Sequence, residues 1–455
     1  MTSIFVFDTT VDNPENGGWN RPPARVNLSG MRIGIIGAGA AGVSVLDALS
    51  LAEPTPSGIT VFESSPWMWR GRAYQPDLEA VRVNAPPALM SIRHGDREHY
   101  WRWLADREGY LDTSLGVPIV PRAVYGEYLE ATALTAIRRL RERGTEVKVV
   151  NDRVTDYSAL QTTMDHVLVC VGGGTPSDHY GLSGREGFVL EPYPLARTLD
   201  GVPTDSHVVV IGSGLTAVDI AVALAATGHS GPITLLSRNG VLPSVQQTPV
   251  KLEFQHLIAE NLPGTFDGLA SLLRAELATH GQDLAPLAGE ITRTEDPVER
   301  LRRQLSEVDS DYLGRRMLAV GIHTLGPAAW RRLPDADRDM LRTGHFRAIT
   351  SLASPMVPVN AEIVLRLLDS GQLRLLAGIP GIEATSRGFH ISGSGELTAD
   401  VVLNAVNPDS GATGPVHVLG SDPADTTFVV PSVPTVAASA SAAVAKICGQ
   451  VRHTG

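Results

Sequence analysis

Two stretches of the chain show the same succession of apolar runs, a glycine-rich segment and residues with helical spacing. In the first, residues 31–36 form an apolar run, a glycine-rich hexapeptide interrupts it, and apolar side chains then recur at helical spacing over residues 43–51, before a second apolar run at 59–62. Short apolar runs beside glycine indicate buried strands, and the i, i+3, i+4 spacing indicates a helix. The pattern predicts a strand, a tight turn, a helix and a parallel strand.

The same pattern returns in the second half of the chain. Residues 207–211 are apolar, a turn with two glycines follows, residues 218–226 have helical spacing, and residues 233–236 are apolar again. A repeated strand, turn, helix and strand predicts two similar α/β units. We therefore expect an α/β fold with two Rossmann-like dinucleotide-binding domains.

Between residues 242 and 348 the alternation of strand and helix patterns is lost. Residues 269–277, 298–305 and 335–341 have helical spacing and many charged positions. Helices with one apolar face and one charged face cover a surface rather than form a sheet. This region is therefore predicted to be a helical insertion.

The C-terminal part of the chain is predicted to return to the two sheets. Residues 399–405 form an apolar run typical of a buried strand, and residues 439–448 favour a final helix that Gly449 is placed to end. We expect this domain organisation: an N-terminal arm over 1–30, a first dinucleotide-binding domain over 31–200 and 406–455, and a second dinucleotide-binding domain over 201–405 that contains the insertion of about 242–348.

The glycine-rich turn of the first unit has the spacing of a dinucleotide site. Gly37 permits the tight turn, Gly39 lets the main chain approach a pyrophosphate, and Gly42 lets helix and strand pack closely. Glu63 ends the second strand, about 20 residues later, where a carboxylate accepts hydrogen bonds from an adenosine ribose. The residues expected to line this site are Gly37, Ala38, Gly39, Ala41, Gly42, Glu63, Ser64, Arg72, Met90 and Gly172.

The second turn has the same design with a different end. Ala217 takes the place of the third glycine, and the following strand ends in Ser237 and Arg238 instead of an acid. A guanidinium and a hydroxyl suit an adenosine 2′-phosphate, so this site favours NADPH over NADH, although a plain surface arginine is the alternative. The residues expected here are Gly212, Ser213, Gly214, Leu215, Thr216, Ser237 and Arg238.

Composition narrows the class of protein. The 455 residues carry 38 Lys and Arg against 49 Asp and Glu, a formal charge of −11, which disfavours a nucleic-acid partner or an anionic membrane. The two cysteines, Cys170 and Cys448, form no CxxC pair, which argues against a disulfide framework or a dithiol redox centre. Neither a secretory signal nor an apolar run of membrane-spanning length is expected, so the cytoplasm is the predicted compartment.

Several motifs together resemble the FAD/NAD(P)-binding oxidoreductase family, whose members have two dinucleotide-binding domains and are related to flavin-dependent N-hydroxylating monooxygenases. The resemblance lies in residues 71–74, 83–86, 90–91, 212–216, 218–219, 237–240 and 242–243. It implies FAD in the first domain, NAD(P) in the second and oxidoreductase activity. The chain lacks the Phe-x-Gly-x-x-x-His signature of Baeyer–Villiger and dimethylaniline monooxygenases between its nucleotide motifs, whereas the N-hydroxylating layout stays compatible.

These observations favour an NADPH-dependent flavin monooxygenase that oxidises a small metabolite, most plausibly by N-hydroxylation of an amine through a C4a-hydroperoxyflavin. Its expected partners are the substrate and molecular oxygen, and a homo-oligomer is compatible with the sequence. Asn84 is the candidate catalytic group, with a plain loop amide as the alternative. His345, Arg347 and Ser351, near the end of the insertion, are candidate substrate contacts. Two rivals stay open: a flavin oxidoreductase without oxygen insertion, and a non-catalytic flavin-binding redox sensor.

Overall fold

The first of two parallel sheets is built around the first glycine-rich turn. The computed structural model describes residues 30–172, 176–378, 381–393, 396–406, 417–418 and 432–450; most of the expected arm, residues 1–29, lies outside them. Within these residues the sheet has the order β15-β6-β1-β2-β5, with all neighbours parallel except β15 and β6. Its strands are β1 (Arg32–Ile36), β2 (Gly58–Phe62), β5 (Glu146–Val150), β6 (His166–Val169) and β15 (His417–Val418).

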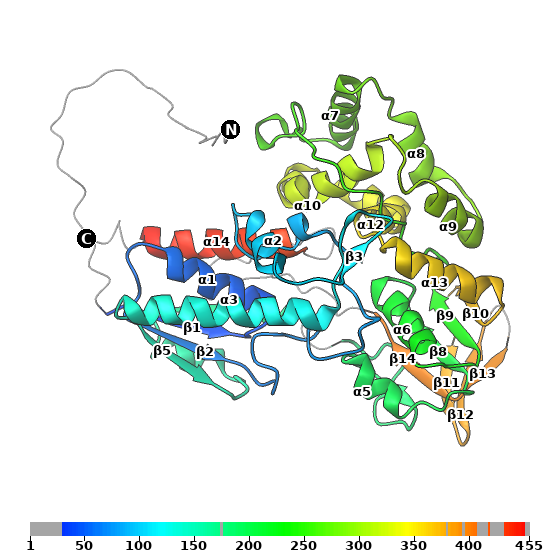
Figure 1. Cartoon of the computed structure of the whole chain (residues 1–455), viewed down its shortest axis with the longest axis horizontal. Helices are drawn as coiled ribbons and strands as arrows, with labels where there is room; N and C mark the ends of the chain where they lie inside the picture. Colours follow the sequence, from blue (N-terminus) through cyan, green and yellow to red (C-terminus); the bar gives the residue numbers. More distant parts are fainter. Residues whose placement is uncertain are drawn as a thin grey trace.

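Three long helices accompany this sheet. α1 (Ala40–Leu51) packs between α3 (Arg122–Glu142) and α14 (Val433–Gln450), and the three run side by side in Figure 1. The final helix is longer than predicted at both ends, and Gly449 lies inside it rather than ending it. A glycine in the last turn of a helix costs only about 1 kcal/mol relative to alanine, so Gly449 does not force the helix to end.

The second sheet contains the second glycine-rich turn and is parallel throughout its described strands. Its order is β10-β9-β8-β14-β7, in which β8 (Val208–Ile211) pairs with both β9 (Ile233–Ser237) and β14 (Val401–Asn404). The outer strands are β10 (Leu373–Ala377) and β7 (Phe188–Val189), so residues 188–189, expected in the first domain, pair in the second sheet. α6 (Leu215–Ala226) and α13 (Pro358–Asp369) pack together beside it.

Because the chain returns to the first sheet with β15 and α14 after completing the second sheet, the second unit is inserted in the first. This confirms the predicted α/β fold with two Rossmann-like units. A small antiparallel sheet, β11 (Gly381–Thr385), β12 (Gly388–Ser392) and β13 (Leu397–Ala399), lies at the edge of the second unit (Figure 1). None of the described helices is long and apolar enough to cross a membrane.

The predicted helical insertion is present and extends to Ala353. Figure 1 shows it as a separate group of helices next to the second sheet. Its described helices are α7 (Phe266–Thr279), α8 (Ala285–Thr292), α9 (Pro297–Ser306), α10 (Gly314–Arg332), α11 (Asp335–Met340), the π-helix η3 (Leu341–His345) and α12 (Phe346–Ala353). α10 was not predicted, because Pro327 and two glycines interrupt its helical pattern.

The remaining described elements are short. They are η1 (Pro87–Leu89), α2 (Glu98–Leu104), β3 (Leu111–Asp112), β4 (Val117–Pro118), α4 (Tyr157–Gln161), α5 (Leu195–Asp200) and η2 (Ala259–Asn261). η1, α2 and the β3–β4 hairpin belong to the long connection between β2 and α3, which carries Arg72, Asn84 and Met90.

Candidate functional site

The first turn leaves room for nothing larger than glycine. Gly37 has a φ of +95°, and a Cβ there would lie 2.6 Å from the carbonyl oxygen of Cys170; a Cβ on Gly42 would collide with the carbonyl oxygen of Gly37. Gly39 lies against Gly71, whose Cα would be 3.2 Å from an added Cβ. α1 begins directly after Gly39, and its first turn holds no acidic side chain. Bare backbone at a helix N-terminus is the environment that a pyrophosphate requires.

Glu63 lies beside this turn, as predicted. Its carboxylate accepts hydrogen bonds from the backbone N–H of Ala38 and of Ser65, at 2.8 Å each. Each carboxylate oxygen has two lone pairs, so both oxygens can also accept hydrogen bonds from ribose hydroxyls. The glycine turn and Glu63 together therefore fit the diphosphate and ribose of an adenine dinucleotide.

The other residues predicted for the first site lie in different surroundings. Arg72 Nε lies 2.8 Å from Glu191 Oε1, and both side chains are partly exposed. Met90 is buried, and its carbonyl accepts a hydrogen bond from Tyr125. Ser64 and Gly172 are exposed, and Ala41 is in the first turn of α1. The carbonyl of Cys170, two residues before Gly172, closes over Gly37, which places the end of β6 beside the turn.

The second turn repeats the geometry with more space. Gly212 has a φ of +121°, and its added Cβ would lie 3.2 Å from the carbonyl oxygen of Ala405. Gly214, which precedes α6, has no protein atom within 4 Å of its added Cβ among the described residues. The Ser213 hydroxyl donates to the carbonyl of Val241 and is buried, so it fixes the loop after β9. Leu215 and Thr216 are the first two residues of α6.

Two arginines from different elements lie near the end of β9. Ser237 is buried at the end of the strand and Arg238 is exposed just after it. Arg347 of α12 lies close enough to Arg238 for the two charges to repel: burial, and then this neighbouring charge, lower the pKa of Arg347. Arg347 was predicted as a substrate contact, but the structure brings it to the residue predicted for the 2′-phosphate. Positive charge is therefore concentrated at the strand end that lacks an acid.

The remaining candidate residues differ in whether their polar atoms already have hydrogen-bond partners in the protein. Ser351 is buried; its hydroxyl donates to the carbonyl of Leu242 at 2.8 Å and lies 3.3 Å from Arg300 Nη1, so it is committed to protein partners. His345 is partly exposed at the end of the π-helix. The amide oxygen of Asn84 is buried and has no hydrogen-bond partner in the described part of the chain. Such a group is costly to leave unpaired, which points to a missing partner.

A buried ion pair between the two units was not predicted. Arg122, at the start of α3, lies 2.7 Å from Asp219 of α6, and Asp219 also accepts a hydrogen bond from Tyr193 at 2.5 Å. Asp77, from the connection after β2, accepts the backbone N–H groups of Leu195 and of its neighbour at the start of α5. The one available signal was a carboxylate in the otherwise apolar α6. These contacts join the two nucleotide-binding units.

The helical insertion also touches the first unit. Thr435, in the first turn of α14, donates to the carbonyl of His323 in α10 at 3.1 Å. Thr248, near the start of the insertion, donates to the carbonyl of Ser114 in the β3–β4 turn at 3.3 Å. The insertion therefore reaches from the second unit to two points of the first.

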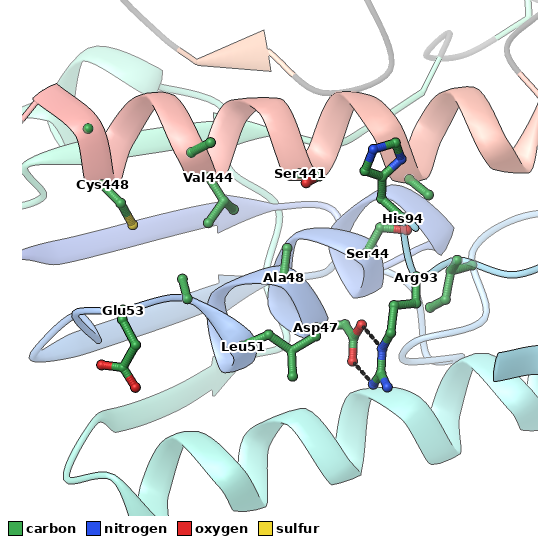
Figure 2. Close-up of a pocket in the computed structure, with 15 residues that line it drawn as sticks. Ser44, Asp47, Ala48, Leu51, Glu53, Arg93, His94, Ser441, Val444 and Cys448 are labelled. Atoms are coloured by element: carbon green, nitrogen blue, oxygen red, sulfur yellow. Dashed lines mark hydrogen bonds and ion pairs between the residues drawn. The ribbon is translucent and has the colours of Figure 1, made fainter. Parts of the chain in front are cut away.

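A cavity of about 430 Å³ lies elsewhere, between α1 and α14 (Figure 2). Asp47 and Arg93 form a two-fold ion pair at its wall, at 2.9 and 2.7 Å, and Ser441 and Cys448 face it from α14. It lies along the C-terminal half of α1, whereas the glycine turn is at the N-terminus of that helix. None of the predicted cofactor or substrate residues lines it, so it is not the nucleotide site.

The comparison with protein-family models agrees with the first site. Residues 34–179 match a family model described as FAD-NAD(P)-binding. No curated protein sequence matches the chain. Three similar solved structures are L-lysine 6-monooxygenase from Pseudomonas syringae (12% identity, 92% of this chain and 99% of that chain, TM-score 0.48), ornithine hydroxylase PvdA from Pseudomonas aeruginosa (12%, 91% and 98%, 0.48) and a cyclohexanone monooxygenase variant from Rhodococcus sp. Phi1 (18%, 84% and 73%, 0.44).

The matched range begins in β1 and includes the first glycine turn, Glu63, Asn84 and β6. It therefore contains the part of the molecule in which the geometry fits an adenine dinucleotide. Over residues 34–179 the chain carries a domain of the FAD-NAD(P)-binding family, as its resemblance to flavoprotein oxidoreductases implied.

Proposed function

We propose that the protein is an NADPH-dependent flavin monooxygenase that oxidises a small metabolite, with N-hydroxylation of an amine as the reaction it fits best. The observation that carries this proposal is the contrast between the two turns: the strand after the first ends in Glu63, and the strand after the second ends in Ser237 and Arg238. An acid suits a free ribose and a base suits a 2′-phosphate, so two different dinucleotides are expected.

The first turn would hold the pyrophosphate of FAD on the backbone N–H groups at the start of α1, and Glu63 would hold its ribose. The second turn would hold NADPH in the same manner, with Arg238 at the 2′-phosphate. When bound, FAD supplies the redox chemistry with NADPH and oxygen, and the protein supplies position and electrostatics. Asn84 would use its unpaired amide oxygen to accept a hydrogen bond from the bound cofactor or substrate.

Exclusion of water is the second requirement that the chain can meet. Oxygen activated on a flavin reaches an amine only if water is kept out of the site. The insertion makes hydrogen bonds to the first unit through His323 and Thr248, so it spans the space between the units. An amine substrate would have to be neutral at nitrogen to act as a nucleophile, which a desolvated site favours.

The test uses the purified full chain loaded with FAD. Expected results are a yellow protein, flavin bleaching by NADPH faster than by NADH under anaerobic conditions, and, on addition of oxygen, hydroxylamine formed from one member of a panel of diamines and amino acids. Bleaching followed by hydrogen peroxide alone across amine, ketone and sulfide panels supports a flavin oxidoreductase instead. No bleaching by either nicotinamide supports a redox sensor, and a chain that cannot retain flavin contradicts the proposal.

A further inference from the structure

We propose that Arg347, a residue of the helical insertion, is a specificity-determining residue for the nicotinamide cofactor: with Arg238 it forms a two-guanidinium clamp for the adenosine 2′-phosphate. This inference rests on the proposed function, because it takes NADPH as the occupant of the second turn. It adds that the insertion, and not only the second sheet, selects the phosphate.

Hydrogen bonds join α12 to the loop that follows Arg238. Ser351 accepts at its carbonyl from both the N–H and the hydroxyl of Ser244, at 3.1 and 2.8 Å, and its own hydroxyl donates to Leu242. Just beyond the helix, the N–H of Met356 donates to the carbonyl of Ser244 at 2.7 Å. Arg347 precedes Ser351 by one helical turn, so both lie on the same face of α12. That face is thereby held against residues 242–244, beside Arg238.

In the described part of the chain, no carboxylate is paired with the two arginines. Within the described residues neither Arg238 nor Arg347 forms an ion pair, and Arg347 Nε is buried without a hydrogen-bond partner. Among the described residues, the one charge that acts on the pKa of Arg347 is that of Arg238, and it lowers this pKa. Two guanidinium groups without a carboxylate make a site for a planar or tetrahedral oxyanion, which they bind through several N–H donors at once.

The consequence is a mechanical link. If one phosphate takes hydrogen bonds from both arginines, then it joins α12 of the insertion to β9 of the second sheet. NADPH would stabilise α12 more than NADH does, because only NADPH carries this phosphate.

The test measures binding rather than turnover. The FAD of the loaded proteins is first reduced with dithionite under anaerobic conditions, so that no electron transfer accompanies binding. The dissociation constants of NADPH, NADH and 2′,5′-ADP are then measured by calorimetry for the wild type and for Arg347→Gln, Arg238→Gln and the double variant. The control is Arg366→Gln, which removes one exposed positive charge from α13 of the same unit. Hydrogen exchange of residues 346–353 with each nicotinamide is the second readout.

We expect Arg347→Gln to raise the dissociation constants of NADPH and 2′,5′-ADP roughly tenfold to a hundredfold, as for the loss of one charged hydrogen-bonding partner. The dissociation constant of NADH should stay unchanged. Arg366→Gln should change the dissociation constant of neither nicotinamide. In the wild type, but not in Arg347→Gln, NADPH should slow the hydrogen exchange of residues 346–353 more than NADH does. Equal weakening of NADPH and NADH, or no change, overturns the clamp while NADPH reduction of the flavin continues. A wild type that binds neither nicotinamide overturns the clamp and the proposed function together.

Discussion

The guanidinium of Arg122 lies 2.7 Å from the carboxylate of Asp219, and the two residues belong to different nucleotide-binding units. Asp219 is fully buried and Arg122 is 12% exposed at its side chain. Burial raises the pKa of Asp219, while Arg122 and the hydroxyl of Tyr193 act in the opposite direction. The relative placement of the two glycine turns thus depends on a desolvated ion pair between α3 and α6.

Removing one partner of this pair is expected to be strongly destabilising. Arg122→Met should lower the free energy of unfolding by about 3–5 kcal/mol, because Asp219 would be buried without its counter-charge. The double variant Arg122→Met/Asp219→Leu should recover part of the loss. Denaturant unfolding of the wild type, Arg122→Met, Asp219→Leu and the double variant measures the coupling between the two side chains. Arg302→Gln, in an exposed ion pair with Asp369, is the control that should leave stability nearly unchanged. A double variant as unstable as the sum of both single variants would contradict this.

The two turns should respond differently to the same substitution. Gly42→Ala places a Cβ against the carbonyl of Gly37 and should abolish flavin retention, whereas Gly214→Ala meets no described protein atom within 4 Å. Gly214→Ala should therefore fold and retain flavin, and weaken NADPH and NADH equally, since its methyl group would occupy the space of the shared pyrophosphate. Flavin absorbance after gel filtration and nicotinamide titration test the pair. Normal NADPH affinity in Gly214→Ala would remove the second turn from the site.

The loss of stability at acid pH should depend on His323. Its Nε2 is 2.6 Å from the carbonyl of Ala353, and burial lowers the pKa of its ring below the ordinary 6.5. Because the folded pKa is the lower one, this histidine contributes stability above pH 6.5 that is lost as the pH falls through the folded pKa. The loss for one group is at most about 1.4 kcal/mol per pH unit.

His323→Gln keeps a donor for Ala353 and should flatten the fall of melting temperature between pH 6.5 and 5. His94→Gln, at an exposed position, is the matched control and should follow the wild type. If His323→Gln and His94→Gln give the same pH profile, then the loss of stability at acid pH does not depend on the buried ring.

The sequence predicts the parts of this molecule that are local. Gly37, Gly42 and Glu63 lie within one strand, turn, helix and strand, so their spacing alone places them around one turn. The helical insertion was likewise visible in its charge pattern, through the segments that became α7, α9 and α11, whereas α8, α10 and α12 were not predicted; in α10 Pro327 interrupts the pattern.

The contacts between distant segments were not predictable in this way. Arg122 contacts Asp219, and Arg347 comes within electrostatic range of Arg238, only because two sheets and an insertion pack together. Such packing leaves no periodic pattern along the chain. The charge of Asp219 inside an apolar helix indicates that a partner must exist. It does not say which arginine supplies it.

A structural role and a functional role for Asn84 predict opposite effects of its replacement. Its amide oxygen is buried and unpaired among the described residues. If the side chain served the fold, then its oxygen would bond to nearby backbone, and replacing it would destabilise the protein. An oxygen that is left unpaired instead costs about 1–3 kcal/mol in desolvation, which the protein retains only if a bound molecule uses the oxygen.

Asn84→Leu should therefore be as stable as the wild type or more stable, by up to about 1 kcal/mol, because it replaces an unpaired polar group by an apolar one of similar size. The same variant should bind FAD and be reduced by NADPH, yet return most electrons to oxygen as hydrogen peroxide instead of product. Melting temperature, flavin reduction rate and the ratio of product to NADPH consumed give the three readouts. A clear loss of stability, with an unchanged ratio of product to NADPH consumed, would assign Asn84 to the fold. The desolvation argument predicts instead that stability is kept or raised and that this ratio falls.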